Sequence, residues 1–157
     1  MMQETIKFAH KGGKVFGVCN GFQILCEAGL LPGVLLKNAN QQFICKNVYI
    51  IGKEEKALKI PIAHGEGRFH ADEKTVEHLL KNEQVIYRYC DEVGTINDQS
   101  NPNGALKNIA GICNEARNVF GMMPHPERAC SNKLANQDGK IVFNSLFLEK
   151  ISATTHA

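Results

Sequence analysis

A short apolar run, Val15 to Val18, leads directly into a cysteine that has one glycine two residues before it and another two residues after it. The pattern Gly17-x-Cys19-x-Gly21 has the spacing of a nucleophile elbow, a sharp strained turn between a strand and a helix, with cysteine in place of serine. The flanking glycines are expected to remove Cβ atoms that would collide where the chain doubles back. This stretch therefore predicts a strand, a strained turn at Cys19 and a helix.

The residues after the cysteine are helix formers and predict a helix from Phe22 to Leu31, which ends at Pro32-Gly33. Cys19 would then lie at a helix N-terminus, where unpaired backbone N–H groups and the helix dipole stabilise negative charge. This position is expected to lower the thiol pKa and to favour the thiolate. The alternative is that Cys19 is a small, buried apolar residue, as most cysteines in such proteins are.

The composition limits the class of protein. A chain of 157 residues with 43% hydrophobic content is large enough for one domain with its own core. The net charge of +2 comes from 18 basic and 16 acidic residues without blocks, so neither nucleic acid nor an acidic membrane is predicted as a partner. No apolar stretch approaches the roughly 20 residues of a membrane helix, and no signal peptide is evident. The sequence predicts a soluble, cytoplasmic protein.

The cysteines and histidines show no disulfide or metal-binding pattern. The six cysteines form neither a CxxC pair nor a dense framework, which favours reduced thiols. The six histidines lack an HExxH motif or a Cys/His cluster with ligand spacing, so no metal site is predicted.

Hydrophobic patterning predicts one α/β domain over residues 1–157, with no internal repeat or linker. Turn signals are expected at residues 53–56 and 101–104, and residues 64–67 are expected to form a loop. Asp72 has the character of a helix N-cap. The helix after Asp72 is expected to carry Val76, Leu79 and Leu80 on one face. The remaining elements predicted are helices over residues 1–10 and about 140–151, strands over residues 47–52, 58–63 and 84–89, and a hairpin of residues 109–113 and 119–123.

A cysteine nucleophile needs a base and a group that orients the base. The segment Met123-Pro-His-Pro-Glu-Arg128 places His125 and Glu127 two residues apart, so that in an extended backbone both side chains project to one side. The carboxylate could then hold the imidazole in one tautomer. The alternative is a polar loop end in which both side chains are merely solvated.

Together, these segments resemble the class I, triad-type glutamine amidotransferases, and within that class the glutaminase subunits of phosphoribosylformylglycinamidine synthase. The resemblance covers nearly the whole chain. It rests on the segments Phe16-Gly-Val-Cys-Asn-Gly-Phe-Gln23, Glu27-Ala-Gly-Leu-Leu-Pro-Gly33, Ile62-Ala-His-Gly-Glu-Gly67, Asn101-Pro-Asn-Gly104, Asn108-Ile-Ala-Gly-Ile112 and Met122-Met-Pro-His-Pro-Glu127. It implies a flavodoxin-like α/β fold with a central, mostly parallel sheet.

The resemblance also implies roles for individual residues. Cys19 would attack the side-chain carboxamide of glutamine, His125 would transfer protons, and Glu127 would orient His125. The residues expected to bind glutamine or its oxyanion are Asn20, Gly21, Gln23, His64, Gly65 and Glu66. Two alternatives remain open: Gln23 could simply pack on the helix after the elbow, and His64 could be a loop histidine hydrogen-bonded to backbone.

The partners implied by the resemblance are a large synthase subunit, which receives ammonia, and a small accessory subunit. ATP and Mg²⁺ would be used by the synthase subunit, and no cofactor is expected in this chain. Arg68 and Arg128 could face the synthase partner or a phosphate, or could simply be solvated.

The beginning of the chain departs from the family pattern. In the family, a preceding segment carries the first strands of the sheet and a glycine-rich loop that contributes to the oxyanion hole, whereas Met1 here falls within the helix before the nucleophile strand. The missing part would amount to roughly 60 residues, at about 30 per strand–crossover unit. One hypothesis is therefore an N-terminally truncated domain, whose strand over residues 15–18 would have an unpaired edge.

Three functional alternatives follow. The chain is a glutaminase component, or it is a catalytically incompetent fragment or docking module of the same family. A third alternative, disfavoured by the extended resemblance, is a related cysteine hydrolase or peptidase with the same elbow.

Overall fold

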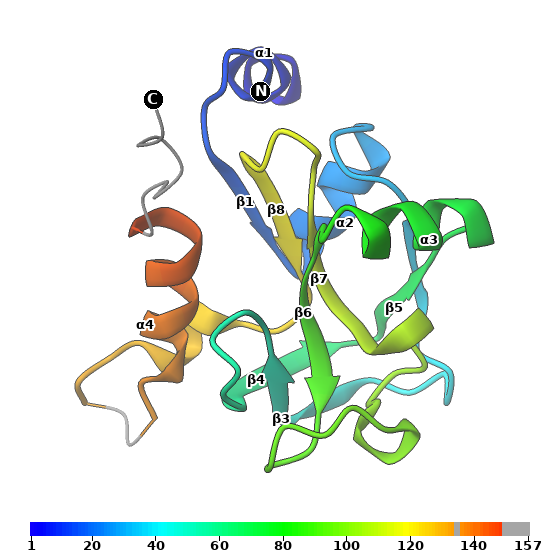
Figure 1. The fold of residues 1–157 in the computed structure, drawn as a ribbon, viewed down its shortest axis with the longest axis vertical. Helices are drawn as coiled ribbons and strands as arrows, with labels where there is room; N and C mark the ends of the chain where they lie inside the picture. Colours follow the sequence, from blue (N-terminus) through cyan, green and yellow to red (C-terminus); the bar gives the residue numbers. More distant parts are fainter. Residues whose placement is uncertain (134–135, 149–157) are drawn as a thin grey trace.

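The computed structural model describes residues 1–133 and 136–148 (Figure 1). The helices are α1 (Met2–His10), α2 (Asn20–Glu27), α3 (Glu73–Lys81) and α4 (Asp138–Phe143), which continues into a π-helical segment, Asn144–Leu148. The strands are β1 (Val15–Val18), β2 (Val34–Lys37), β3 (Ile44–Ile51), β4 (Leu58–His64), β5 (Glu66–His70), β6 (Val85–Cys90), β7 (Ile109–Cys113) and β8 (Val119–Met122). Within these described residues, no helix is long and apolar enough to cross a bilayer.

Six of the described strands form one sheet in the order β1-β8-β7-β6-β3-β4. Strands β1 and β8 are parallel, whereas each other neighbouring pair is antiparallel. The predicted α/β class is confirmed, but the expectation of a mostly parallel sheet is wrong for the described strands, which form a mixed sheet. The connections over residues 52–57 and 114–118 are too short for a crossover helix, so the strands that they join must be antiparallel.

The strand that precedes the cysteine lies at one end of this sheet. β1 pairs with β8 alone among the described strands, with Gly17 opposite Gly121. Its other edge is therefore open in the described part of the chain, as the resemblance led us to expect.

The two faces of β1 and β8 are covered differently. Phe16 and Phe120 point to the face covered by the segment after α4, where both rings make edge contacts with Phe147. Gly17 and Gly121 lie on the other face, beneath α2. Figure 1 shows α2 and α4 on opposite sides of these strands. The absence of side chains at Gly17 and Gly121 lets α2 pack directly on the backbone, which brings the start of α2 to the end of β1.

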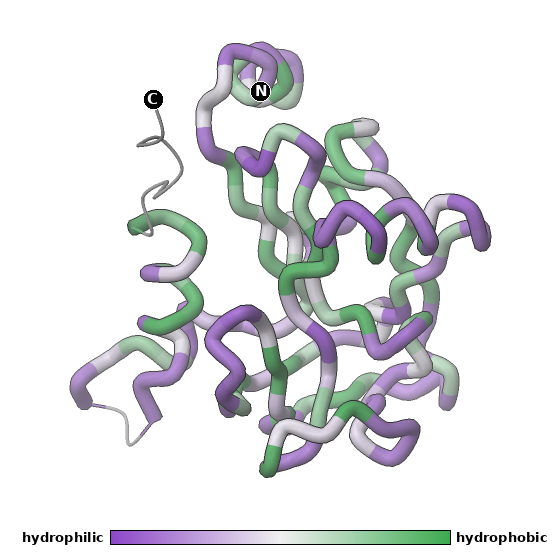
Figure 2. The backbone as a smooth tube through the Cα atoms, in the orientation of Figure 1, coloured by the Kyte–Doolittle hydropathy of each residue, from purple (hydrophilic) through white to green (hydrophobic). Residues whose placement is uncertain are grey.

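The core lies along the central strands and beneath α2, where Figure 2 shows hydrophobic backbone positions surrounded by hydrophilic turns. The largest fully buried side chains are Phe22, Ile50, Leu58, Ile60, Ile62, Phe69, Leu79, Tyr87, Tyr89, Ile109, Ile112 and Met122. They come from the six-stranded sheet, from the helices and from β5, so one continuous core supports the elements around Cys19.

A second, two-stranded sheet was not predicted. Strands β2 and β5 pair antiparallel, with Leu35 opposite Phe69, and the Phe69 ring stacks on Phe22 of α2 at 6.0 Å between centroids. The expectation of a loop over residues 64–67 is therefore wrong: β4 extends to His64, and β5 begins at Glu66 after a single residue. Pairing with β2 and burial of Phe69 hold this polar segment extended.

Several predicted boundaries are confirmed and others shift. The strand over residues 15–18, the hairpin of β7 and β8 and the turn at residues 101–104 form as predicted. The N-cap at Asp72 is confirmed, because Asp72 Oδ1 accepts a hydrogen bond from the Thr75 backbone N–H at 3.0 Å. Helix α2 begins at Asn20 and ends at Glu27, short of the predicted Leu31, because Gly29 takes a positive φ of 71°. The last predicted helix begins at Asp138, and its final residues 149–151 lie outside the described residues.

Candidate active site

Cys19 occupies a strained turn between β1 and α2, as the glycine spacing predicts. Its backbone has φ 53° and ψ −109°, a conformation that non-glycine residues rarely adopt. The Cys19 N–H donates to the Met122 carbonyl at 2.9 Å, which continues the β1–β8 pairing to the turn. The sheet therefore fixes one side of the elbow, and the start of α2 fixes the other.

The two glycines that flank Cys19 differ in how closely other atoms approach them. A Cβ on Gly17 would lie 2.5 Å from the carbonyl carbon of Gly21 and 2.6 Å from its oxygen. A Cβ on Gly21 would meet nothing within 4 Å, so the expectation that both glycines avoid a collision is wrong for Gly21. Gly17 alone provides the space, because it is the residue that faces the first turn of α2.

His125 and Glu127 lie where the chain leaves β8. The His125 N–H donates to the Pro61 carbonyl at 2.8 Å, which ties this segment to β4. His125 Nδ1 lies 2.7 Å from Glu127 Oε1, and His125 is only 8% exposed. The predicted contact thus forms, although the backbone is not extended: Pro126–Ala129 is a 3-10 helix, because Pro126 occupies its first turn and fixes the helical φ.

Helix α4 supports this segment through a glycine that sequence analysis did not select. Gly139 is buried, and a Cβ there would collide with the Pro126 carbonyl oxygen. Close approach of α4 to the 3-10 helix therefore requires glycine at this position. The predicted helix pattern did not contain this signal, because the contact joins residues far apart in the sequence.

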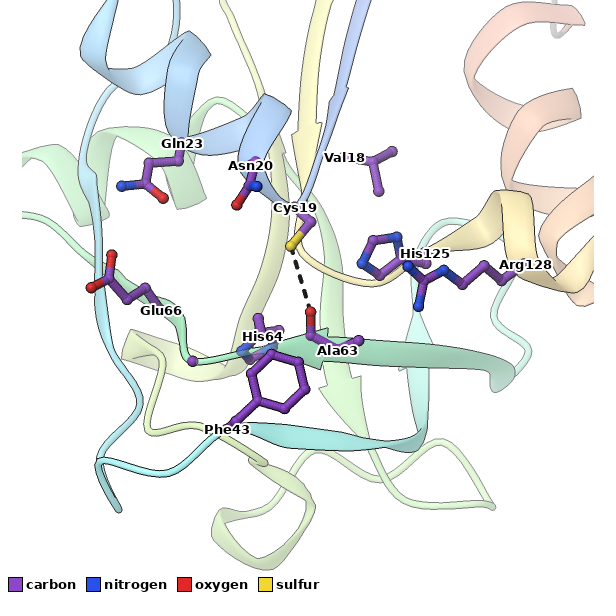
Figure 3. Close-up of a pocket in the computed structure, with 11 residues that line it drawn as sticks. Val18, Cys19, Asn20, Gln23, Phe43, Ala63, His64, Glu66, His125 and Arg128 are labelled. Carbon is purple, nitrogen blue, oxygen red and sulfur yellow. Dashed lines mark hydrogen bonds between the residues drawn. The ribbon is translucent and has the colours of Figure 1, made fainter.

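One cavity brings the predicted residues together. It has a volume of about 470 Å³ and lies between the end of β1, the start of α2, the end of β4 and the 3-10 helix. Its lining consists of Val18, Cys19, Asn20, Gln23, Phe43, Ala63, His64, Gly65, Glu66, His125 and Arg128 (Figure 3). The structure thus places five of the six expected glutamine-binding residues around Cys19. Gly21 is not among the lining residues.

Figure 3 shows the Cys19 side chain between two groups of residues, His125 and Arg128 on one side and Gln23 and Glu66 on the other. Phe43 lies in no motif, and Ala63, although it lies within the motif of residues 62–67, was not predicted as a site residue because it acts through its backbone carbonyl. The Ala63 carbonyl oxygen lies 3.8 Å from Cys19 Sγ and accepts its weak hydrogen bond. Phe43 is 68% exposed at the cavity edge, close to Gly65.

The protonation state of Cys19 differs from our expectation. Burial raises the pKa of the Cys19 thiol above its ordinary value, and the Glu127 carboxylate adds to this effect. The Asn20 backbone N–H and the Arg128 guanidinium lower the pKa, but they do not offset burial. The helix start thus acts in the predicted direction, yet desolvation of the anion is the larger effect. In this conformation Cys19 is a neutral thiol at pH 7, so a nucleophilic role would require that its proton be removed.

Alkylation tests this protonation state. Iodoacetamide modification of Cys19 in the free chain is expected to be slow at neutral pH and to rise with pH through a midpoint above that of an ordinary thiol, because the thiolate is the reactive form. Peptide mass spectrometry over a pH series measures the rate of modification of Cys19, with exposed Cys45 as the internal reference. Cys26, whose pKa burial raises to about 12, should react last. Faster modification of Cys19 than of Cys45 at pH 7 would contradict a neutral thiol.

His64 is buried against the cavity at 3% exposure. Its Nδ1 lies 3.0 Å from Asn38 Oδ1, so the expected alternative of a hydrogen bond to backbone is replaced by one to a side chain. Burial and the nearby His125 lower the pKa of His64 to about 4. Its Nε2 is buried and has no hydrogen-bond partner among the described residues, and the same holds for Nε2 of His125.

The lowered pKa of His64 predicts a loss of stability in acid. Between pH 6.5 and about 4 the unfolded chain binds a proton at this residue and the folded chain does not, so the free energy of unfolding falls as the pH falls. The contribution of His64 reaches about 3 kcal/mol at the acid end. Urea unfolding of the wild type and of His64→Asn at pH 7, 5.5 and 4 measures it. The free energy of unfolding of the variant should depend less on pH, and equal slopes would contradict the lowered pKa.

The other marked residues have structural roles. Arg68 donates from Nε to the Lys37 carbonyl at 3.0 Å, which links β5 to β2. The turn at residues 101–104 reaches the site indirectly, because Asn103 Nδ2 donates to the Gly67 carbonyl at 2.8 Å. All six cysteines are free, and burial raises the thiol pKa of Cys90 to about 11. No cluster of His, Cys, Asp or Glu in residues 1–133 and 136–148 is arranged to hold a metal ion.

Comparison with known proteins identifies the family. The model of the CobB/CobQ-like glutamine amidotransferase domain matches residues 1–140. Subunit PurQ of phosphoribosylformylglycinamidine synthase from Salinibacter ruber is 45% identical to this chain, over 93% of the chain and 67% of the relative. The corresponding subunit from Koribacter versatilis is 48% identical, over 93% of the chain and 68% of the relative.

A solved structure agrees with these relatives. A chain in the structure of PurLQS from Thermotoga maritima superposes with a TM-score of 0.73 at 40% identity, over 91% of this chain and 65% of that chain. The chain thus spans about two thirds of the length of these relatives. The resemblance inferred from the motifs is confirmed: the chain belongs to the CobB/CobQ-like glutamine amidotransferase family, among the relatives of the PurQ subunits.

Proposed function

We propose that this chain is the glutaminase component of phosphoribosylformylglycinamidine synthase, which hydrolyses glutamine to glutamate and ammonia for de novo purine synthesis. The observation that carries the proposal is the placement of Cys19, on a strained turn, in the same cavity as His125, whose Nδ1 is held by Glu127 at 2.7 Å. The PurQ relatives support the choice of substrate and pathway.

The proposed first half of the reaction uses Cys19 and His125. Because Glu127 faces Nδ1, the Nε2 atom of His125 is the nitrogen available to take the proton from Cys19 Sγ. Sulfur then forms a bond to the carboxamide carbon of glutamine. Backbone N–H groups at the start of α2, at Asn20 and Gly21, are the proposed donors to the resulting oxyanion. Each such donor stabilises the transition state by about 3 kcal/mol. His125 returns its proton to the leaving nitrogen, and the C–N bond breaks to give ammonia and a thioester on Cys19.

The second half returns the site to its starting state. A water molecule attacks the thioester carbon while His125 Nε2 accepts its proton. The C–S bond breaks, glutamate is released, and the proton on His125 returns to sulfur. Residues Gln23, His64, Gly65 and Glu66 are the proposed contacts of the bound glutamine, supported by their position around the cavity.

The proposal extends to partners and location. Ammonia passes to a large synthase subunit, with a small accessory subunit in the same assembly, and the likeness to the PurLQS structure supports this arrangement. ATP and Mg²⁺ act in the synthase subunit, and residues 1–157 act as one amidotransferase domain without a cofactor of their own. A cytoplasmic location is consistent with six unpaired cysteines.

The test is a glutaminase assay on the purified chain, with and without the large synthase subunit, that measures glutamate and ammonia together. We expect equal amounts of both products from the wild type, with a higher rate when the synthase subunit is present. If the chain binds the synthase subunit but releases no glutamate under any condition, the docking-module alternative holds instead.

A further inference from the structure

Strand β4 lies at one end of the six-stranded sheet and pairs with β3 alone among the described strands. Every second residue of a strand turns its backbone N–H and C=O groups to the same edge. In β4 the residues that turn them away from β3 are Lys59, Pro61 and Ala63, as their hydrogen bonds to other segments show. We call this row of three residues the outer edge of β4. Such an edge needs partners from elsewhere in the chain.

One end of the outer edge contacts the proposed nucleophile and the proposed base. The Ala63 carbonyl accepts the weak hydrogen bond of Cys19 Sγ at 3.8 Å, and the Pro61 carbonyl accepts from the His125 N–H at 2.8 Å. Pro61 has no N–H of its own, so this position leaves no donor unpaired. Figure 3 shows Cys19 and His125 on the same side of the strand that carries Ala63. Neighbouring positions of one strand thus hold both groups.

The other end of the outer edge is held by two side chains at the start of α4. Asp138 Oδ2 accepts from the Lys59 N–H at 2.8 Å, and Asn136 Nδ2 donates to the Lys59 carbonyl. A neighbouring antiparallel strand would make these same two bonds to Lys59. The Asp138 N–H also donates to Asn136 Oδ1 at 3.0 Å, which fixes the two residues relative to each other. The start of α4 therefore takes the place of a strand at this edge.

A second contact joins the start of α4 to the residue that follows His125. A Cβ on Gly139 would collide with the Pro126 carbonyl oxygen, so the helix backbone lies directly against this carbonyl. The same oxygen accepts a hydrogen bond from Cys130 Sγ at 2.9 Å. The 3-10 helix that carries Glu127 is consequently held between α4 and β4. Loss of the bonds between α4 and the outer edge would release it.

We infer that Asn136 and Asp138 are positioning residues: by holding α4 on the outer edge of β4, they fix His125 relative to Cys19. The inference rests on the proposed function for the reaction that is affected. Neither Asn136 nor Asp138 is among the residues that line the cavity. Their effect therefore belongs to proton transfer by His125 and not to contact with the substrate.

Replacements of Asp138 separate its hydrogen bond from its charge. Asp138→Ala removes the acceptor, and we expect kcat to fall about 10-fold with KM within about 2-fold of the wild type. Asp138→Asn keeps an oxygen that can accept from the Lys59 N–H but loses the charge that lies 4.0 Å from Lys56 Nζ, and it should restore kcat to within about 2-fold. Asn136→Ala, which removes the donor at the same edge, should lower kcat in the same way.

Asp72→Ala is the matched control. It also removes a carboxylate that accepts a backbone N–H at the start of a helix, here from Thr75, and Asp72 is not among the residues that line the cavity. We expect its kcat and KM to equal those of the wild type. A loss of kcat that Asp72→Ala shared with Asp138→Ala would assign the effect to general stability.

Hydrogen exchange of backbone amides, followed by NMR of the ¹⁵N-labelled whole chain, tests the coupling without reference to activity. We expect Asp138→Ala to speed exchange of the Lys59 and His125 amides about 10-fold or more, because the bonds that protect them weaken together. Asp138→Asn should restore both rates. Asp72→Ala should speed exchange of the Thr75 amide and leave that of His125 unchanged.

Four results would overturn the inference: wild-type kcat in Asp138→Ala, an equal loss of kcat in Asp138→Ala and Asp138→Asn, a loss of kcat shared by Asp72→Ala, or a His125 amide whose exchange Asp138→Ala leaves unchanged. These results are separable from a failure of the proposed function. If the wild type releases no glutamate, the His125 amide still reports whether the start of α4 holds this segment. An active wild type in which that amide does not respond contradicts the inference alone.

Discussion

Replacement of Cys19 by alanine is expected to reduce the glutaminase rate by a factor on the order of 10⁴ to 10⁶, to the level of the uncatalysed background. The thiol is the group that forms the covalent bond to the substrate. Cys26, the next cysteine in the sequence, is not positioned to replace it. Cys26 has a thiol pKa of about 12 and lies on α2 with its Sγ directed to the Pro32 carbonyl. The assay is release of glutamate at saturating glutamine, with the synthase subunit present.

The same variant should fold as well as the wild type. Cys19 is half-buried, and alanine differs from it by the loss of one sulfur atom at the same strained backbone position. We expect its free energy of unfolding to change by less than about 1 kcal/mol, and its affinity for glutamine to remain measurable. Equal rates of ammonia release by wild type and Cys19→Ala would contradict the proposal that the chain is a glutaminase that uses Cys19.

Replacement of Gly17 by alanine is expected to destabilise the chain and to displace α2 from the end of β1. The new Cβ would lie 2.5 Å from the Gly21 carbonyl carbon and 2.6 Å from a Leu25 methyl group, so α2 must move away from the end of β1. Overpacking of this kind costs about 2–3 kcal/mol. Because α2 carries the residues next to Cys19, we also expect kcat/KM to fall about 100-fold. Urea unfolding and the glutamate assay measure the two effects.

Gly21→Ala is the matched control for stability. It adds the same methyl group on the other side of the elbow, where a Cβ has nothing within 4 Å. Gly21 lies inside α2, and alanine is favoured over glycine in a helix by about 1 kcal/mol. We therefore expect its free energy of unfolding to be unchanged or higher. Equal destabilisation by the two variants would contradict the asymmetric elbow that the structure shows.

Elements with a strong local pattern could be predicted from the sequence. The strand over residues 15–18 and the hairpin of β7 and β8 are short apolar runs bounded by clear turn signals, and both form as predicted. The N-cap at Asp72 depends on residues within one helical turn, so its signal is contained in the sequence. The hairpin and the N-cap are stabilised by contacts between residues close in sequence, whereas the strand over residues 15–18 pairs with the distant β8 and is recognisable only from its apolar run.

The second sheet could not be predicted in the same way. Strand β5 contains Glu66, Arg68 and His70 around a single buried aromatic residue, so its apolar signal is weak. It is extended because β2, about 30 residues earlier in the chain, pairs with it and because Phe69 packs on α2. The mixed direction of the main sheet was not predicted for a different reason. The expectation of a mostly parallel sheet rested on the family resemblance, whereas the short connections between strands indicate antiparallel pairs.

In the candidate site, too, residues marked by local motifs could be predicted, whereas residues that act through distant contacts could not. The motifs selected Cys19, His125 and Glu127, because their spacing carries the geometry of the elbow and of the His–Glu contact. Asn38 carries no motif, and its importance comes from hydrogen bonds to residues 26 and 29 positions away. Likewise, the raised pKa of Cys19 results from burial by the tertiary structure, which outweighs the helix start that the local sequence indicates.

The most direct test of Cys19 as the nucleophile is covalent trapping with a diazoketone analogue of glutamine, followed by peptide mass spectrometry of the whole chain. We predict a single adduct on Cys19 that excess glutamine prevents and that is absent in Cys19→Ala. An adduct on Cys26 or Cys113 in place of Cys19, or labelling that glutamine does not suppress, would contradict the account.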